Sequence, residues 1–193
     1  MTDSDSKAAL RLTMRARRRA LAADRPDAPL RAAAIYEAAP VRDVRTAAVY
    51  VPQGAEFDSL PLARVLAASG ARLALPAVAE RDCALEFRAW TPGETLTPDA
   101  LGVPAPPAGA PVVVPDLVVA PLLAFDKHGR RLGQGGGYYD RTLAQLRAAS
   151  GVVALGLGYA AQEIDDLADE AHDQRLDGVL TEDDLRVFAR EPD

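Results

Sequence analysis

DLVVAPLLAFDKHGRRLGQGGGYYDRTL, residues 116–143, is the stretch that constrains the architecture most. Its first ten residues, 116–125, form a nearly continuous apolar run, which is typical of a central strand in a parallel sheet. A glycine loop at 133–137 follows, and a helix is expected from about Tyr138 to Ala149. A strand, a glycine loop and a helix in this order predict an open α/β sheet that binds a ligand at the loop.

The segments on both sides continue the alternation of strands and helices. Strands are predicted at 46–52, 72–78, 85–90, 152–159 and 177–182. Helices are predicted at about 6–23, 27–38 and 58–69, the last capped by Asp58 and ended by Gly70. This order predicts a three-layer α/β fold in which an open, mostly parallel sheet carries helices on both faces. We expect one domain over 1–193, crossed at its surface by a proline-rich loop at about 91–111.

Composition limits the classes of partner. The chain has 193 residues, of which 49% are hydrophobic and 26% charged, and its net charge of −6 argues against nucleic acid as the main ligand. The N-terminus has no apolar signal-peptide core, and no apolar stretch is long enough to cross a membrane. The single cysteine, Cys83, excludes an internal disulfide and fits a reducing compartment. We expect a cytoplasmic monomer that binds small molecules, with no nucleic-acid or membrane partner.

The glycine loop is a candidate phosphate site. Consecutive glycines leave main-chain N–H groups unshielded, and the start of a helix adds partial positive charge. Arg130 and Arg131 can add charge-assisted hydrogen bonds, and Asp140 can hold a Mg²⁺ ion that bridges phosphates. The loop matches neither the Walker A pattern nor Gly-x-Gly-x-x-Gly. On spacing alone, a flexible turn with solvated arginines fits equally well.

Basic residues recur along the first predicted helix at a spacing that places them on one face. They are Lys7, Arg11, Arg15 and Arg18. Such a face is usually solvated. Its functional interpretation is that Lys7 and Arg11 reach the same phosphates as the glycine loop.

A second glycine motif, GLGYAA at 156–161, satisfies the looser Gly-x-Gly-x-x-Ala fingerprint of dinucleotide sites. It would make the chain a nicotinamide-dependent enzyme. The segment that follows is crowded with acidic residues, which would repel a pyrophosphate. We therefore interpret this match as accidental.

Several single residues have both a structural and a functional interpretation. Glu56 follows a strand and either binds the polar edge of a heterocycle or caps the next helix. Trp90 either belongs to the core or stacks on a flat ring. His172 and Asp173 either make loop hydrogen bonds or orient a substrate or metal. The spacing of the histidines does not indicate a zinc site.

Together these segments resemble the 5-formyltetrahydrofolate cyclo-ligase family, also called methenyltetrahydrofolate synthetase. The resemblance covers most of the chain and is carried by four stretches: KAALR (7–11), VYVPQGAEFDSLPL (49–62), PLLAFDKHGRRLGQGGGYYDRTL (121–143) and HDQRLDGVLTE (172–182). The third stretch is long and specific. It is a far stronger indication than a generic glycine loop.

The resemblance implies an enzyme that closes 5-formyltetrahydrofolate to 5,10-methenyltetrahydrofolate with ATP and Mg²⁺, releasing ADP and phosphate. In that chemistry the formyl oxygen attacks the γ-phosphorus, N10 attacks the resulting imidate phosphate, and phosphate departs. Such a reaction asks the protein mainly for positioning and charge stabilisation.

The resemblance also implies roles for individual residues. The expected catalytic residues are Arg131 and Lys7. The expected ATP-binding residues are Lys7, Arg11, Arg131, Gly133, Gln134, Gly135, Gly136, Gly137 and Tyr139. The expected substrate-binding residues are Glu56, Trp90 and Tyr138. The expected Mg²⁺ ligands are Asp140 and, as a weaker candidate for metal or substrate, Asp173.

Four positions depart from the family pattern. Leu122 stands where a glycine is expected, Gln134 replaces a basic or aromatic residue, Ala105 replaces an acid, and Ala168 replaces a proline. These departures leave an alternative open, in which the chain is a nucleotide- or folate-binding module with impaired turnover. The glycine loop, the arginine, the paired tyrosines and the aspartate are all retained, which favours an active enzyme.

Overall fold

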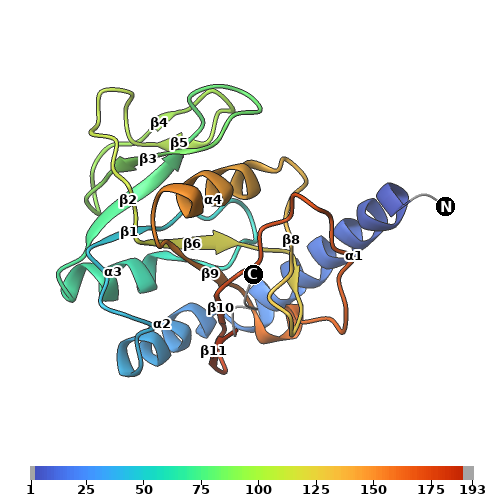
Figure 1. Ribbon diagram of the computed structural model, residues 1–193. Helices are drawn as coiled ribbons and strands as arrows, with labels where there is room; N and C mark the ends of the chain where they lie inside the picture. Colours follow the sequence, from blue (N-terminus) through green and yellow to red (C-terminus); the bar gives the residue numbers. More distant parts are fainter. Residues whose placement is uncertain (1–2, 189–193) are drawn as a thin grey trace.

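A computed structural model describes residues 3–188, and in it helices cover a central sheet (Figure 1). The sheet has seven strands in the order β11-β10-β9-β6-β1-β2-β3, with parallel neighbours except at the two edges. The strands are β1 (Thr46–Ala48), β2 (Arg72–Ala77), β3 (Glu86–Ala89), β6 (Leu117–Pro121), β9 (Val153–Leu157), β10 (Gly178–Leu180) and β11 (Leu185–Val187). The predicted α/β fold with a mostly parallel sheet is confirmed.

The helices lie within a few residues of their expected positions. They are α1 (Asp3–Asp24), α2 (Ala28–Ala38), α3 (Leu60–Ala68) and α4 (Tyr138–Ala149). The short 3-10 helix η1 (Ala160–Gln162) was not predicted. The N-cap of α3 is Ser59 rather than the predicted Asp58. The Asp58 carboxylate lies one residue earlier and accepts a hydrogen bond from the Leu60 N–H. After α3, Gly70 has a φ of +94°, a conformation that favours glycine and ends the helix.

Side chains alternate along the central strand β6 between two apolar layers. Leu117 and Val119 pack in the cluster that contains residues of α2 and α3. Val118 and Ala120 pack in the cluster that contains Leu143 of α4. Successive side chains of a strand point to opposite faces of the sheet, so a continuous apolar run fills both layers. This burial explains why helices cover both faces of the sheet.

The chain leaves the sheet at Pro121, so the strand predicted at 116–125 is too long. A proline has no N–H to donate to a neighbouring strand, which favours the end of pairing at this residue. Residues beyond it form a separate hairpin of β7 (Ala124–Phe125) and β8 (Arg131–Leu132). This hairpin carries the chain directly into the glycine loop.

A buried carboxylate closes the turn of that hairpin. Asp126 accepts hydrogen bonds from the N–H groups of His128 and Arg130, and from the Arg130 side chain. It also accepts one from the N–H of Leu167, in a segment that is distant in sequence. The start of the glycine loop is therefore fixed to two parts of the fold.

The strand order changes direction between β1 and β6. From β1 the chain passes through α3 to β2 on one side, whereas β6 and β9 lie on the other side. In open α/β sheets such a switch leaves a crevice beyond the carboxyl ends of the strands, where ligands bind. Glu56 follows β1, and the glycine loop follows β6. The topology therefore brings both predicted site segments to one edge of the sheet.

Helix α1 lies at this edge of the sheet (Figure 1). Its residues Leu10 and Met14 pack against Leu123 and Leu132 of the segment that follows β6. The basic residues Lys7, Arg11 and Arg18 lie beside this apolar stripe on the helix and line the cavity at this edge. The helix thus forms one wall of the crevice.

The proline-rich loop contains more order than the sequence indicates. It holds a two-stranded ribbon formed by β4 (Thr97–Pro98) and β5 (Pro104–Ala105). The Asp99 carboxylate accepts hydrogen bonds from the N–H groups of Val78, Leu101 and Val103. Val78 follows β2, so this carboxylate fixes the ribbon beside the carboxyl end of a central strand.

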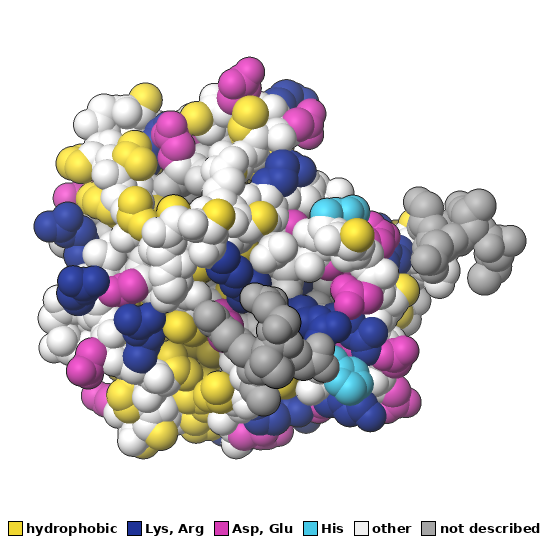
Figure 2. All heavy atoms as spheres, in the orientation of Figure 1, with side chains coloured by type: hydrophobic (Ala, Val, Ile, Leu, Met, Phe, Trp, Pro, Cys, Tyr) yellow, Lys and Arg dark blue, Asp and Glu magenta, His cyan; other side chains and the backbone are white. Residues whose placement is uncertain are grey.

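Within residues 3–188, no helix is both long and apolar enough to cross a bilayer. On the face shown in Figure 2, basic and acidic side chains are interspersed.

Replacement of Leu117 by Ala tests the central role of β6. Leu117 is fully buried, so this change should lower the free energy of unfolding by about 2–5 kcal/mol and the melting temperature by about 4–20 °C. Thermal unfolding followed by circular dichroism measures the shift. The matched control is Leu12→Ala, because the Leu12 side chain on α1 is 67% exposed. An equal loss of stability in both variants would contradict the assignment of β6 to the core.

Candidate active site

A cavity of about 390 Å³ lies at the switch point, within the size range of small-molecule sites. Its walls come from α1, the segments after β1 and β2, the proline-rich ribbon, the glycine loop and the start of α4, and the acidic segment around residue 170. Residues 7 and 173 therefore reach the same space from opposite ends of the chain. The cavity is the common location of most residues predicted from the sequence.

The glycine loop adopts a backbone that other residues rarely tolerate. Gly135 has a φ of +103° and Gly137 has a φ of +65°. Gly137 is the N-cap of α4, so the loop leads directly into the positive end of a helix. Among the described residues, the main-chain N–H groups from Gly133 to Asp140 have no hydrogen-bond acceptor. The loop thus offers a run of free donors of the kind that binds phosphate.

Two arginines of α1 hold the outer side of this loop. Arg11 Nε donates a hydrogen bond to the Gly133 carbonyl at 3.2 Å. Arg15 Nε donates to the Gln134 side-chain oxygen at 2.9 Å. The Gln134 side chain is therefore engaged with α1. The glutamine that stands here in place of a basic or aromatic residue is thus held by Arg15.

Arg131 and Asp140 form an ion pair at the inner side of the loop. Arg131 Nη2 lies 2.8 Å from Asp140 Oδ1, and the Arg131 side chain is 5% exposed. Arg131 also donates to the Gln174 carbonyl, and the Gln174 N–H donates to Asp140. This network connects β8, α4 and the acidic segment. It holds one guanidinium and one carboxylate in fixed positions on the cavity wall.

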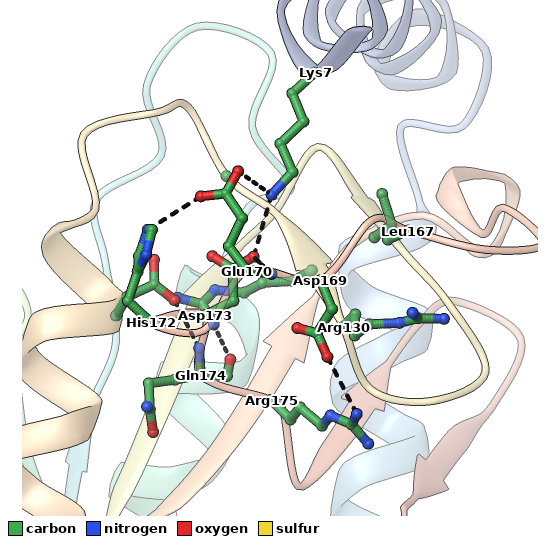
Figure 3. A network of polar contacts seen from close by, with 12 residues as sticks. Lys7, Arg130, Leu167, Asp169, Glu170, His172, Asp173, Gln174 and Arg175 are labelled. Carbon is green, nitrogen blue, oxygen red and sulfur yellow. Dashed lines mark hydrogen bonds and ion pairs between the residues drawn. The ribbon is translucent and has the colours of Figure 1, made fainter. Parts of the chain in front are cut away.

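Lys7 projects from α1 into a group of acidic residues (Figure 3). Its Nζ lies 2.7 Å from Glu170 Oε1 and 3.2 Å from Asp173 Oδ2. His172 Nε2 lies 3.3 Å from the other Glu170 oxygen. Partial burial by itself lowers the pKa of Lys7, but its hydrogen bonds to Glu170 and Asp173 outweigh burial and raise this pKa above the usual value. Lys7 is therefore cationic at neutral pH.

The same acidic group has the donor atoms of a metal site. Single ligand atoms of Glu170, His172 and Asp173 lie within 4.8 Å of one another. The hydrogen bond and charge of Lys7 lower the pKa of Glu170, so its carboxylate is ionised at neutral pH. Asp140, the other predicted ligand, lines the same cavity but is not a member of this group.

The far end of the cavity contains a second buried ion pair. Arg18 Nη1 lies 3.7 Å from Glu56 Oε1, and the two side chains are 7% and 9% exposed. Glu56 Oε2 accepts a hydrogen bond from the Gln53 N–H at 3.0 Å. Tyr50 lies nearby, and its hydroxyl donates to the Phe57 carbonyl. Glu56 closes the turn after β1, and it also faces the cavity.

The paired tyrosines at the start of α4 differ in their surroundings. The Arg141 guanidinium lies over the Tyr138 ring, 4.9 Å from its centre. The Tyr138 hydroxyl accepts a weak hydrogen bond from the Asp82 N–H at 3.4 Å. Burial, with the nearby Glu56 carboxylate, raises the pKa of Tyr139, so this hydroxyl stays protonated. Both rings line the cavity between its two ends.

Trp90 and Arg130 were singled out in the sequence and are placed elsewhere, and Gly136 of the glycine loop does not line the cavity either. Trp90 is buried and lines a separate hollow between β2 and the proline-rich loop, so it does not reach the cavity. Arg130 pairs with Asp126 and Asp166 and is likewise absent from the cavity wall. Trp90 therefore belongs to the core, and Arg130 supports the hairpin.

The structure also adds residues that the sequence interpretation missed. Arg18 was recognised on the basic face of the first helix, but no role was assigned to it. Glu170 lies in the acidic segment that was judged unfavourable for phosphates. Leu101 and Val103 lie on the cavity wall only because the proline-rich ribbon folds back. The helical spacing was a usable signal for Arg18, whereas the sequence contains no comparable signal for the ribbon.

Packing explains the glycines of GLGYAA. A Cβ atom on Gly156 would lie 2.6 Å from a Leu176 methyl group, and one on Gly158 would lie 2.7 Å from Leu122. The segment then enters η1, which is only three residues long. The glycines make room for side chains rather than for a dinucleotide, which supports the interpretation of the motif as accidental. Leu122 fills the space beside both glycines.

Comparisons with known proteins agree over nearly the whole chain. The model of the 5-formyltetrahydrofolate cyclo-ligase family matches residues 3–182. The 5-formyltetrahydrofolate cyclo-ligase of Mycolicibacterium smegmatis is 36% identical over 146 residues, which cover 71% of this chain and 73% of that protein. The protein of the same name from Escherichia coli is 33% identical over 147 residues, covering 74% and 80%.

Solved structures show the same relationship. The structure of 5,10-methenyltetrahydrofolate synthetase from Aquifex aeolicus superposes with a TM-score of 0.78 at 26% identity, covering 97% of this chain and 95% of that one. The synthetase from Mycoplasma pneumoniae gives a TM-score of 0.71 at 25% identity, covering 91% and 98%. The chain therefore belongs to the 5-formyltetrahydrofolate cyclo-ligase family.

Proposed function

We propose that this chain converts 5-formyltetrahydrofolate to 5,10-methenyltetrahydrofolate, using ATP with Mg²⁺ and releasing ADP and phosphate. The observation that carries the proposal is the single cavity in which free main-chain donors, cationic side chains and a buried carboxylate meet. The donors and cations suit a triphosphate, and the carboxylate suits a heterocycle that carries N–H groups. Membership of the family supports the same reaction.

The glycine loop and α1 form the nucleotide end. The free N–H groups of residues 133–140 would bind the phosphate oxygens, with the N-terminus of α4 adding its dipole. Arg11 lies against this loop, where it donates to the Gly133 carbonyl, and Lys7 lies one turn away on α1. Both line the cavity, where they would neutralise phosphate charge. Tyr139, at the start of α4, would contact the nucleotide through its free main-chain N–H, since its hydroxyl lies near Glu56.

The acidic side chains fit a magnesium ion in chemistry, because Mg²⁺ prefers carboxylate oxygens together with substrate phosphates. Asp140 and Asp173 would hold it, with Glu170 beside Asp173. When bound, the ion neutralises charge that develops on the transferred phosphoryl group. Each predicted ligand pairs with a cation, Asp140 with Arg131 and Asp173 with Lys7. Arg131 and Lys7 therefore lie next to the carboxylates that would hold the ion, where phosphates bridged by it would also meet these two cations.

The chemical step is a phosphoryl transfer followed by ring closure. The formyl oxygen attacks the γ-phosphorus, the bond to the β-phosphate oxygen breaks, and ADP leaves. N10 then attacks the activated formyl carbon, the carbon–oxygen bond to phosphate breaks, and the N10 proton is lost. Arg131 is held rigidly by Asp140 and Gln174, so it would stabilise the charge on the transferred group without reorganisation.

The end of the cavity beside Glu56 would hold the pterin. The Glu56 carboxylate is buried and accepts N–H donors, and Tyr138 would pack beside the ring system. Glutamine at position 134 keeps the main-chain N–H of the loop as a donor. Its side chain binds Arg15 on α1. Ala105 is buried in the ribbon and leaves the cavity carboxylates intact. These observations favour turnover over a binding module with impaired activity.

The cytoplasmic location and the monomeric state stay predictions from the sequence.

The direct test is a turnover assay. The protein is incubated with ATP, Mg²⁺ and 5-formyltetrahydrofolate, and near-ultraviolet absorbance of the methenyl product is followed. We expect product formation that requires ATP and stops when Mg²⁺ is chelated. Binding of both substrates by calorimetry without product would instead identify the chain as an impaired binding module. Absorbance no greater than in a reaction without protein would contradict the proposal.

Replacement of Arg131 by Ala tests the role of the guanidinium. Loss of a buried charge that acts on the transferred group should lower kcat by about 100-fold or more. Arg64→Ala is the matched control, because Arg64 is exposed on α3 away from the cavity. Steady-state kinetics and thermal unfolding of both variants separate lost chemistry from lost stability. An unchanged kcat in the Arg131 variant would refute the assignment.

Replacement of Gly135 by Ala tests the backbone cradle. A Cβ at a φ of +103° strains the loop and moves its N–H groups, so the KM for ATP should rise by about tenfold or more. Gly70→Ala introduces the same kind of strain, since its φ is +94° and nothing lies within 4 Å of the added carbon. The control should lose stability but keep its KM for ATP. Equal KM values in the two variants would argue against the cradle.

A further inference from the structure

Arg18 is a buried cation whose donors are largely unused. The residue is 6% exposed and lines the cavity. Its Nη1 donates one hydrogen bond, to the Leu122 carbonyl at 3.3 Å. Its Nε is buried and has no hydrogen-bond partner, and its Nη2 has none in the part of the chain that the structure describes. A guanidinium carries several N–H donors, and buried donors without acceptors are costly.

The Glu56 carboxylate does not satisfy these donors. At 3.7 Å, Arg18 Nη1 and Glu56 Oε1 attract each other electrostatically but are too far apart for a hydrogen bond. Glu56 Oε2 is bound by the Gln53 N–H, whereas Oε1 has no hydrogen bond to any described residue. The pair therefore presents a cationic donor and an anionic acceptor side by side, and both retain hydrogen-bonding capacity.

A lactam is the ligand group that complements such a pair. Its carbonyl oxygen accepts from a guanidinium, and its adjacent N–H donates to a carboxylate. A pterin carries this unit in its pyrimidine ring, where a ring carbonyl lies next to a ring N–H. The nucleotide end is too distant to supply the missing acceptor, because Lys7 and Arg18 are separated by roughly 16 Å along the α1 axis.

We propose that Arg18 binds the substrate directly, donating to the lactam carbonyl of the pterin while Glu56 accepts from the adjacent ring N–H. Arg18 is then a specificity-determining residue of the heterocycle end. This inference rests on the proposed folate substrate and adds a residue to its recognition. It also supplies an acceptor for the hydrogen-bond donors that Arg18 leaves unpaired.

The test measures the affinity of two ligands by calorimetry without ATP. One is 5-formyltetrahydrofolate. The other is an analogue in which a methylene group replaces the ring carbonyl, so that the adjacent ring N–H is kept. The Arg18→Met variant should bind the parent ligand about 10- to 100-fold more weakly than the original protein, because a hydrogen bond to a charged group is lost. Its affinity for the analogue should change by less than about threefold, since the analogue has no oxygen for Arg18 to bind.

The matched control is Arg19→Met, which removes the same charge one position along α1. Arg19 is exposed and does not line the cavity, so both affinities should stay within about twofold of the original values. If Arg18→Met weakens both ligands equally, or neither of them, the proposed contact with the carbonyl is wrong.

A second pair of variants separates direct contact from support of Glu56. If Arg18 only holds Glu56 in place, Arg18→Met has no further effect on parent affinity in a Glu56→Gln background. A direct donor predicts a further loss of about tenfold in that background. Absence of the further loss would overturn the inference.

Loss of folding in Arg18→Met would be detected by thermal unfolding, and Arg18→Lys is then used instead. Lysine keeps the charge but not the planar fork, so parent affinity should still fall by about fivefold or more, with the analogue unaffected. The original protein could turn over substrate while the variant keeps the same ratio of affinities for parent ligand and analogue as the original protein. That result would overturn this inference and leave the proposed function standing. No binding of the parent ligand by the original protein would overturn the proposed function and this inference with it.

Discussion

The attachment of α1 to the carboxyl edge of the sheet is the constraint on which the site depends. Apolar residues of this helix pack on the segment that follows β6, and its arginines donate to main-chain carbonyls there, Arg11 to Gly133 and Arg18 to Leu122. These contacts place cations along the crevice at the spacing of helical turns. Without the helix, the glycine loop would face solvent and Glu56 would lose its counter-charge. One amphipathic helix thus adds the wall that turns the crevice at the switch point into a partly enclosed cavity.

The chemistry of the cavity changes along this helix. At one end, Lys7 is surrounded by carboxylates that keep it protonated. At the other end, burial lowers the pKa of Arg18, and the Glu56 carboxylate opposes this effect. Two substrates bound end to end, with phosphates beside Lys7 and a heterocycle beside Arg18 and Glu56, would match this difference between the two ends. Water-exposed charges would be screened, but charges on the walls of a partly enclosed site act at short range.

Periodic patterns in the sequence predicted the layers of the fold well. The continuous apolar run of β6 and the helix at 138–149 were identifiable because burial leaves a direct signature in residue type. The end of β6, the β7–β8 hairpin and the edge strand β11 were not predicted, since each depends on tertiary pairing of only a few residues. Trp90 shows the same limit at the site. An aromatic residue at a strand end looks the same in the sequence whether its ring packs in the core or stacks on a ligand. Only the path of the proline-rich loop distinguishes the two roles.

Two ion pairs join α1 to residues far along the chain. Lys7 binds Asp173, 166 residues away, and Arg25 binds Glu182, 157 residues away. Contacts of such long sequence separation form late, because a large loop must close before they contribute. During synthesis on the ribosome, α1 must therefore wait for these later segments before its docking can be completed. Until then its arginines and apolar stripe remain open to other molecules in the cell.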